Sequence, residues 1–211
     1  KSKGLLLQTP LDQDDDGGGG GGGGNAFSGS STRRRKRQQA RAYKRIGDLC
    51  LFACCPSDAV KHYEAAVEQC RAANDHVWAA AADEGIAASL VANERIKTLV
   101  GEAAHWVPDV VSFCLEAAKE LSKHPGGDGA QLATLELEST LKLTRYLAQK
   151  RARWGQALTL LSGLTAKLPH VVDAHHHVQL LLEAALLCED MRYRRKFAHF
   201  MLAAEIGRAH V

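Results

Sequence analysis

The sequence has few aromatic residues, no cysteine pair of the CxxC type and no long hydrophobic run. Phe, Tyr and Trp make up only 6% of the 211 residues, so Leu, Ala and Val must supply most of the core. Alternating runs of β-branched residues are also nearly absent, which favours helices over strands. No run approaches the roughly 18 apolar residues that a membrane-spanning helix needs. These absences predict an all-α protein without a transmembrane segment.

Six cysteines are present, and their spacing fits neither a zinc site nor a dithiol redox motif. Most fall on predicted apolar helix faces, so we expect buried, reduced thiols in a cytoplasmic protein. Cys50 and Cys54 share a face, but it is the predicted core face, and Cys55 adjoins them. No secretory signal is visible, and a chain that starts at Lys1 is expected to be a fragment of a longer protein.

The net charge of +3 hides a basic segment near the N-terminus. Residues 33–45 contain eight basic residues and no acid, which leaves −5 for the rest of the chain. The segment opens with Arg33, Arg34, Arg35, Lys36 and Arg37. A solvated helix start and contact with an acidic partner or an anionic membrane surface both remain open. Nucleic acid is the least favoured ligand, because no aromatic residues are interleaved with the basic ones.

Both ends of the chain are expected to lie outside the folded region. Residues 1–32 combine an acidic stretch with the unbroken glycine run Gly17–Gly24, so they predict a disordered acidic, Gly-rich linker. Residues 205–211 read EIGRAHV, which matches the translation of a common sequencing-library adaptor. We therefore expect a helical segment over residues 33–204, followed by a non-native tail.

Apolar periodicity predicts a succession of helices joined by short loops, so that neighbours pack antiparallel. Pro56 is expected to end the first helix, Ser57 to cap the second, and Asn74 with Asp75 to form the next turn and cap. Leu115 and Met201 are among the residues assigned to inward faces. The predicted helices cover residues 34–54, 58–73 and 76–92, a segment from Pro108, and residues 130–150, 153–168, 172–188 and 193–204.

The first helices match the pattern of a tetratricopeptide repeat, in which small residues allow close helix crossing and aromatics fill the space between repeats. We therefore predict antiparallel helical hairpins forming a tetratricopeptide-like α-solenoid segment. A simple antiparallel helical bundle would give much of the same pattern. The structural repeat positions are Tyr43, Ile46, Gly47, Ala59, Tyr63, Ala66, Trp78 and Gly85.

No group of residues predicts a catalytic, cofactor or metal site. His175, His176 and His177 are consecutive on a helix and diverge by about 100° each, so they cannot share one ion. Adjacent acids such as Asp83 and Glu84 diverge in the same way. Nothing assembles a nucleophile, a base and an orienting group. The sequence therefore predicts a protein that is not an enzyme and needs no cofactor.

Two stretches resemble one family of trafficking proteins. The first is KRIGDLCLFA with DAVKHYEAAVEQCRAANDHVWAAAADEGIAAS, and the second is LELESTLKLTRYLAQKRARWGQALTLL. They are similar to the large subunit of the TRAPP II vesicle-tethering complex, the NIBP family. The matching residues are Ile46 to Leu51, His62, Tyr63, Val67, Glu68, Arg71, Asn74, Asp75, Trp78, Glu84, Gly85, Glu138, Lys142, Arg145, Leu147, Ala148, Lys150 and Arg151.

The resemblance implies a non-catalytic scaffold segment of a TRAPP II-type tethering complex. Its partners would be other TRAPP subunits and, indirectly, a Rab GTPase whose activation and vesicle traffic it supports. The implied location is cytoplasmic, peripheral at the Golgi in the trans-Golgi network. The alternative is a generic tetratricopeptide-like adaptor that binds a peptide or protein partner.

Overall fold

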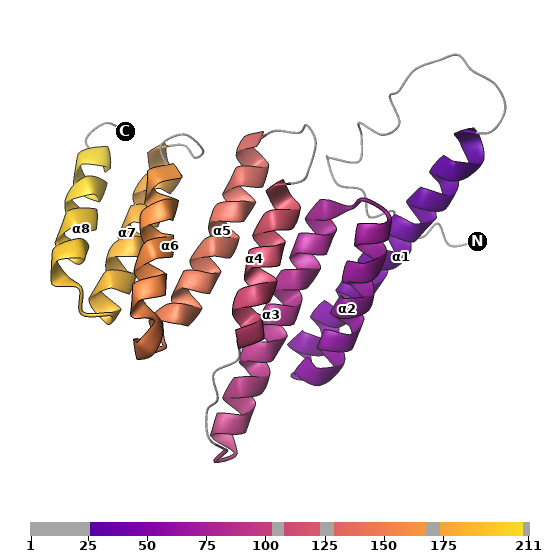
Figure 1. The fold of residues 1–211 in the computed structure, drawn as a ribbon, viewed down its shortest axis with the longest axis horizontal. Helices are drawn as coiled ribbons and strands as arrows, with labels where there is room; N and C mark the ends of the chain where they lie inside the picture. The colour runs from indigo at the N-terminus through magenta and orange to yellow at the C-terminus, as the bar shows by residue number, and fades with distance from the viewer. Residues whose placement is uncertain (1–25, 103–107, 123–128, 168–173, 209–211) are drawn as a thin grey trace. The chain divides into compact units, whose positions relative to one another are not determined.

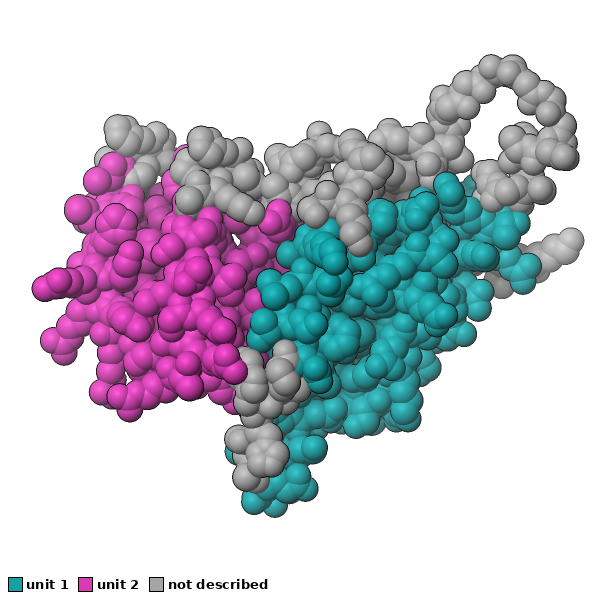
Figure 2. Space-filling view, viewed as in Figure 1, with its two compact units in different colours: residues 1–127 teal, residues 128–211 magenta. Residues whose placement is uncertain are grey.

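The computed structural model describes residues 26–102, 108–122, 129–167 and 174–208. Nearly all of these residues are helical, and none of them lies in a strand. The predicted all-α class is therefore confirmed. The chain divides into two compact units, residues 1–127 and 128–211 (Figure 2). Each unit is described by itself below.

The described residues of unit 1 form four consecutive helices, each packed on its neighbour in the sequence (Figure 1). The helices are α1 (Ala26–Phe52), α2 (Pro56–Ala72), α3 (His76–Leu99) and α4 (Pro108–Ser122). Helix α1 also contacts α3, so the first three helices share one core. Short turns join α1 to α2 and α2 to α3, which makes these neighbours antiparallel.

Within the described part of unit 2, the helices form two hairpins that contact each other. The elements are α5 (Gly129–Ala148), the short 3₁₀ helix η2 (Arg151–Arg153), α6 (Trp154–Lys167), α7 (Ala174–Asp190) and α8 (Arg194–Arg208). Helix α5 packs on α6 and α7 packs on α8, while α7 also touches α5 and α6. Leucines such as Leu147 and Leu161 are almost fully buried in this unit.

Several helix boundaries differ from those expected. Helix α1 begins at Ala26 and so includes the last residues of the predicted linker, and α3 runs on to Leu99 instead of ending near residue 92. Helix α8 continues past Ala204 to Arg208, into the segment expected to be a non-native tail. The remaining residues of the linker, the rest of the tail and the break at residues 124–128 lie outside the described residues.

Three hairpin turns use the same hydrogen-bond pattern, each with one residue at positive φ. These residues are Cys54 (φ 59°), Asn74 (φ 53°) and Arg192 (φ 60°). In each turn the following amide donates to the carbonyl five residues earlier, as from Cys55 N to Cys50 O at 2.8 Å. This is the Schellman arrangement, which usually places glycine at the left-handed position. Asparagine is the common alternative to glycine there, so Asn74 fits the pattern, whereas Cys54 and Arg192 are unusual residues for this position.

The helix starts also differ from the predicted caps. Pro56 is the first residue of α2 rather than only the end of α1, and Cys55 is the cap position, so Ser57 does not cap the helix. Asp75 does precede α3, but its side chain makes no capping hydrogen bond. Its carboxylate accepts a hydrogen bond from Arg41 instead.

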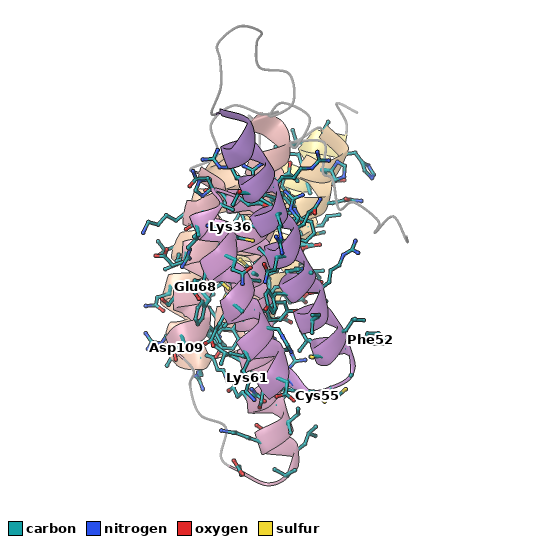
Figure 3. All side chains as sticks on the ribbon, turned by 90° about the vertical axis from the view of Figure 1, so that its right-hand side faces the viewer. Lys36, Phe52, Cys55, Lys61, Glu68 and Asp109 are labelled. Carbon is teal, nitrogen blue, oxygen red and sulfur yellow. The ribbon has the colours of Figure 1, made fainter. Side chains whose placement is uncertain are left out.

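The expectation of buried thiols is wrong for Cys54 and Cys55 in the α1–α2 turn. Cys54 and Cys55 are exposed there, and Figure 3 shows Cys55 at the end of the hairpin beside the protruding Phe52. The turn geometry explains this, because the left-handed residue leaves the helix and carries both side chains away from the core. Leu115 and Met201, assigned to inward faces, are 51% and 40% exposed.

The thiols therefore predict a selective labelling pattern. In the folded chain at pH 7.5, maleimide is expected to modify Cys54 and Cys55 within minutes and to leave Cys70, Cys114 and Cys188 unmodified. Burial raises the pKa of Cys70 to about 12, which suppresses its reactive thiolate as well as its access to the reagent. Mass spectrometry of tryptic peptides reports each site. Rapid modification of Cys70 would show that the core of unit 1 is open.

Candidate functional site

Tyr63 organises the core of unit 1. Its side chain is 1% exposed and packs among Ala59, Ala66, Val67, Ala82 and Ile86. Its hydroxyl donates a hydrogen bond to Asp48 Oδ1 at 2.8 Å, and burial together with this bond raises the pKa of the phenol. The ring is thus fixed at both ends, by apolar packing and by one polar contact.

Two glycines leave room for the Tyr63 ring. A Cβ at Gly47 of α1 would lie 2.7 Å from ring carbons of Tyr63, and one at Gly85 of α3 would lie 2.5 Å from a carbon of the same ring. Both distances are too short for real contacts. The ring therefore occupies the space between α1 and α3 that the glycines open.

The predicted repeat positions fall into three groups in the structure. Ala59, Tyr63 and Ala66 are buried, and Gly47 and Gly85 face the Tyr63 ring. Tyr43 and Trp78 are half-buried, with Tyr43 stacked on His62 at a centroid distance of 6.4 Å. Ile46 is 40% exposed, so it contributes little to the described core of unit 1. It lies one residue before Gly47 and points to the outer side of α1.

Arg71 of α2 joins three helices through carboxylates that sequence reasoning did not bring together. Its Nη2 lies 2.9 Å from Asp83 Oδ2 on α3, and its Nε lies 3.0 Å from Glu120 Oε1 on α4. Glu120 also contacts His76 Nδ1 at 2.9 Å. The carboxylate side chains are only 1% and 2% exposed. No local spacing links residues 71, 83 and 120, so only the packing of the helices reveals the cluster.

Burial dominates the electrostatics of Asp83. Desolvation raises the pKa of Asp83 to about 6, with Glu120 and Glu116 acting in the same direction, while Arg71 opposes the rise. Because removing a carboxylate from water favours its neutral form, the Arg71 guanidinium is what keeps Asp83 largely ionised at neutral pH. The cluster therefore serves to pair buried charge between helices.

Two basic residues of the N-terminal segment bind the α2–α3 turn. Arg41 Nε lies 2.8 Å from Asp75 Oδ2 in a pair that is nearly fully buried, and its guanidinium lies 5.1 Å from the Trp78 ring centroid. Arg37 donates to the carbonyl oxygens of Ala73 and Asn74. The basic segment is therefore only partly a solvated face. Arg33, Arg34, Arg35 and Lys36 are exposed on α1.

The outer side of α1 presents an apolar face. Ile46, Leu49 and Phe52 are 40%, 67% and 90% exposed, and they follow one another at helical spacing of three residues. Phe52 projects from the end of the helix in Figure 3. We call Ile46, Leu49 and Phe52 the α1 face. Exposed apolar residues that share one helix face are a candidate contact surface for a partner.

A groove of about 520 Å³ lies between α2, α3 and α4. Its lining combines carboxylates with apolar side chains, and we call it the acidic groove. The lining residues are Glu64, Val67, Glu68, Arg71, Asp83, Ile86, Ser112, Phe113 and Glu116. Four carboxylates and one guanidinium give it a net formal charge of −3.

The other candidate groups stay apart. His175 and His176 are exposed on α7, and His175 Nε2 contacts Gln179 of the same helix at 3.1 Å. Within the described ranges, no three His, Cys, Asp or Glu side chains are placed to hold a metal ion. Among the described helices, none is both long enough and apolar enough to cross a membrane.

The described helices and side chains define an all-α protein of packed helical hairpins, whose polar clusters join one helix to the next. A family model described as Trs120/TRAPPC9, N-terminal domain, matches residues 13–98. The TRAPP II-specific subunit 120 homologue of Oryza sativa subsp. japonica is 31% identical over 204 residues, which cover 95% of this chain and 16% of that protein. The chain therefore belongs to the Trs120/TRAPPC9 family, the large subunit of TRAPP II.

Two further relatives support the same assignment. The TRAPP II-specific subunit 120 homologue of Arabidopsis thaliana is 31% identical over 208 residues, again 95% of this chain and 16% of that protein. TRAPP complex subunit 9 of Xenopus laevis is 49% identical over 81 residues, 38% of this chain and 7% of that protein. The chain thus spans about a sixth of the plant relatives. No solved structure matches it.

Proposed function

We propose that this chain is a non-catalytic scaffold segment of a TRAPP II-type tethering complex. Its partners are other TRAPP subunits, and through them it supports activation of a Rab GTPase and vesicle traffic at the trans-Golgi network. The observation that carries the proposal is the family match, since both plant relatives are named as TRAPP II-specific subunits and align along 95% of the chain.

We further propose that the helices form a tetratricopeptide-like α-solenoid segment. Supporting this, the helices of unit 1 pack in sequence order, and Tyr63 of α2 fills the space that Gly47 of α1 and Gly85 of α3 leave open. Small residues at helix crossings and an aromatic between them are the features by which such arrays stack. Arrays of this kind act by presenting extended surfaces to partners.

The α1 face is the proposed contact with a TRAPP subunit. Ile46, Leu49 and Phe52 lie on a side of α1 that none of the other described residues covers, as their exposure shows. Aromatic residues, Phe included, are enriched in the buried part of protein interfaces, so Phe52, which is 90% exposed, suits a contact with a partner. The basic residues Arg33 to Lys36 lie further toward the N-terminus of the same helix, where an anionic membrane surface is a second proposed contact.

Affinity purification of the tagged full-length parent from cell extract, followed by mass spectrometry, tests the proposed function. Recovery of small TRAPP subunits together with a Rab GTPase is the expected result. Recovery of chaperones or nucleic-acid-binding proteins with no TRAPP subunit would contradict it.

A tetratricopeptide-like adaptor that binds a peptide is the second candidate function. One observation favours it, namely the acidic groove between α2, α3 and α4. A groove of this volume holds a few side chains of a bound segment rather than a folded domain.

A further inference from the structure

We propose that the acidic groove binds a Lys- and Arg-rich segment of a partner protein, with one apolar side chain of that segment seated among Val67, Ile86 and Phe113. The proposal states which kind of ligand a second contact surface of the chain would bind. It rests on the proposed function, in which the chain acts by contact with other proteins. It does not require the partner to be a TRAPP subunit.

The carboxylates of α2 carry the argument. Glu64 and Glu68 are exposed, and within the described part of the chain neither forms an ion pair or a hydrogen bond. They are four residues apart on one helix, where two like charges destabilise the helix slightly. This pair of carboxylates therefore does not stabilise the fold. A cationic ligand bound beside the pair would be stabilised by it.

Arg71 does not neutralise these two glutamates. Its guanidinium is held by Asp83 at 2.9 Å and by Glu120 at 3.0 Å, on the α3 and α4 side of the groove. Glu116 of α4, whose carboxylate is 4.0 Å from Arg71 and 3.3 Å from Lys119, adds a further acid to the lining. The negative charge of Glu64 and Glu68 on the α2 side of the groove is thus available to attract a cationic ligand.

The acidic surface continues along α4. Asp109, Phe113 and Glu116 follow one another at spacings of four and three residues, so they share one side of α4. Figure 3 shows Glu68 and Asp109 on the same side of unit 1. A ligand that follows the groove therefore meets carboxylates from both walls and an aromatic side chain between them.

The charge of the groove selects among classes of ligand. Nucleic acids and anionic lipids carry the same sign as the groove and are repelled. A basic protein segment is attracted at long range, and its aliphatic stems can cover the apolar lining while the charged groups reach the carboxylates. Charge complementarity and the apolar lining together point to a basic amphipathic segment.

Fluorescence anisotropy with the full 211-residue chain tests the proposal. The probe is a fluorescein-labelled 12-residue peptide in which Lys and Arg surround two Leu residues. Saturable binding at 50 mM NaCl is expected, and the Glu64→Lys/Glu68→Lys variant should bind at least about tenfold more weakly because two attractive contacts become repulsive. Both substituted residues are exposed, so circular dichroism should show an unchanged fold.

A charge-matched variant separates the groove from general electrostatic attraction. Glu138→Lys/Glu189→Lys makes the same change in net charge at two exposed positions of unit 2 and should bind the probe as the wild type does. Absence of binding to the wild type, or an equal loss in both variants, would overturn the proposal. Concentration-dependent dimerisation abolished by Glu64→Lys/Glu68→Lys would also overturn it, by identifying a second copy of the chain as the occupant.

The peptide-binding experiment uses the purified chain without any other TRAPP subunit, so this experiment and the affinity purification can fail independently. Loss of peptide binding leaves the TRAPP assignment untouched, and a failed co-purification leaves the groove measurement intact.

Discussion

Replacing Arg71 with methionine is expected to lower the free energy of unfolding by about 3 kcal/mol at pH 7.5. Asp83 and Glu120 would lose the guanidinium that pairs with them, and their side chains are 1% and 2% exposed. Methionine retains most of the apolar stem, so the loss reports the missing charge rather than a cavity. Urea unfolding followed by circular dichroism measures the change.

The pH dependence of this variant distinguishes charge from packing. Burial raises the pKa of Asp83 to about 6, so the folded state binds a proton more tightly than the unfolded state does. The stability that Asp83 contributes is therefore complete below its ordinary pKa of 3.8 and declines as pH rises toward 6. Without Arg71, which opposes the shift, the decline should extend to higher pH. The penalty of Arg71→Met should thus be smaller at pH 5 than at pH 7.5.

Lys61→Met is the matched control. Lys61 pairs with Asp58 at 2.9 Å on the surface of α2, where both side chains are largely exposed. Surface pairs of this kind contribute little to stability, so no measurable change is expected. Equal unfolding curves for Arg71→Met and wild type at both pH values would show that the buried cluster is not paired as the structure has it.

Alanine at Gly85 is expected to destabilise the chain by about 2 kcal/mol, although alanine normally favours helices over glycine. Its Cβ would lie 2.5 Å from the Tyr63 ring, and the ring cannot retreat easily because its hydroxyl is bonded to Asp48. Alanine at Gly47 meets the same ring at 2.7 Å and should act in the same direction. Thermal unfolding of each variant provides the measurement.

Two controls make the explanation specific. Gly163 of α6 has open space where a Cβ would be, so Gly163→Ala should stabilise the chain, by up to roughly 1 kcal/mol. In a Tyr63→Leu background, Gly85→Ala should cost much less than in the wild type, because the smaller side chain leaves room. An undiminished cost in that background would refute contact with the ring as the cause.

Sequence patterns predicted the parts of this fold that depend on local periodicity. The helices were predicted because apolar residues recur at helical spacing. Gly47, Tyr63 and Gly85 were predicted as repeat positions because tetratricopeptide repeats place small residues where helices cross and aromatic residues in the space between them. The structure adds why they matter, since one ring fills the space that two glycines leave.

The geometry of the turns and the polar clusters could not be predicted from local periodicity. Cys54 and Arg192 adopt the left-handed conformation without being glycine or asparagine, so the sequence did not predict which residue takes that conformation in these two turns. Arg71, Asp83 and Glu120 meet only because α2, α3 and α4 pack together. Likewise, Ile46 fits the apolar stripe of α1 by spacing, and its exposure depends on which side of the helix its neighbours cover.

The central claim is that this helical segment acts by contact with other TRAPP subunits through the α1 face. Its most direct test compares co-purified TRAPP subunits for the full-length parent carrying Leu49→Asp/Phe52→Asp and for wild type, by quantitative mass spectrometry. The account predicts at least about a fivefold loss of TRAPP subunits, with no loss for Leu186→Asp/Leu202→Asp, which alters two exposed leucines of unit 2. Undiminished recovery of TRAPP subunits with Leu49→Asp/Phe52→Asp would contradict it.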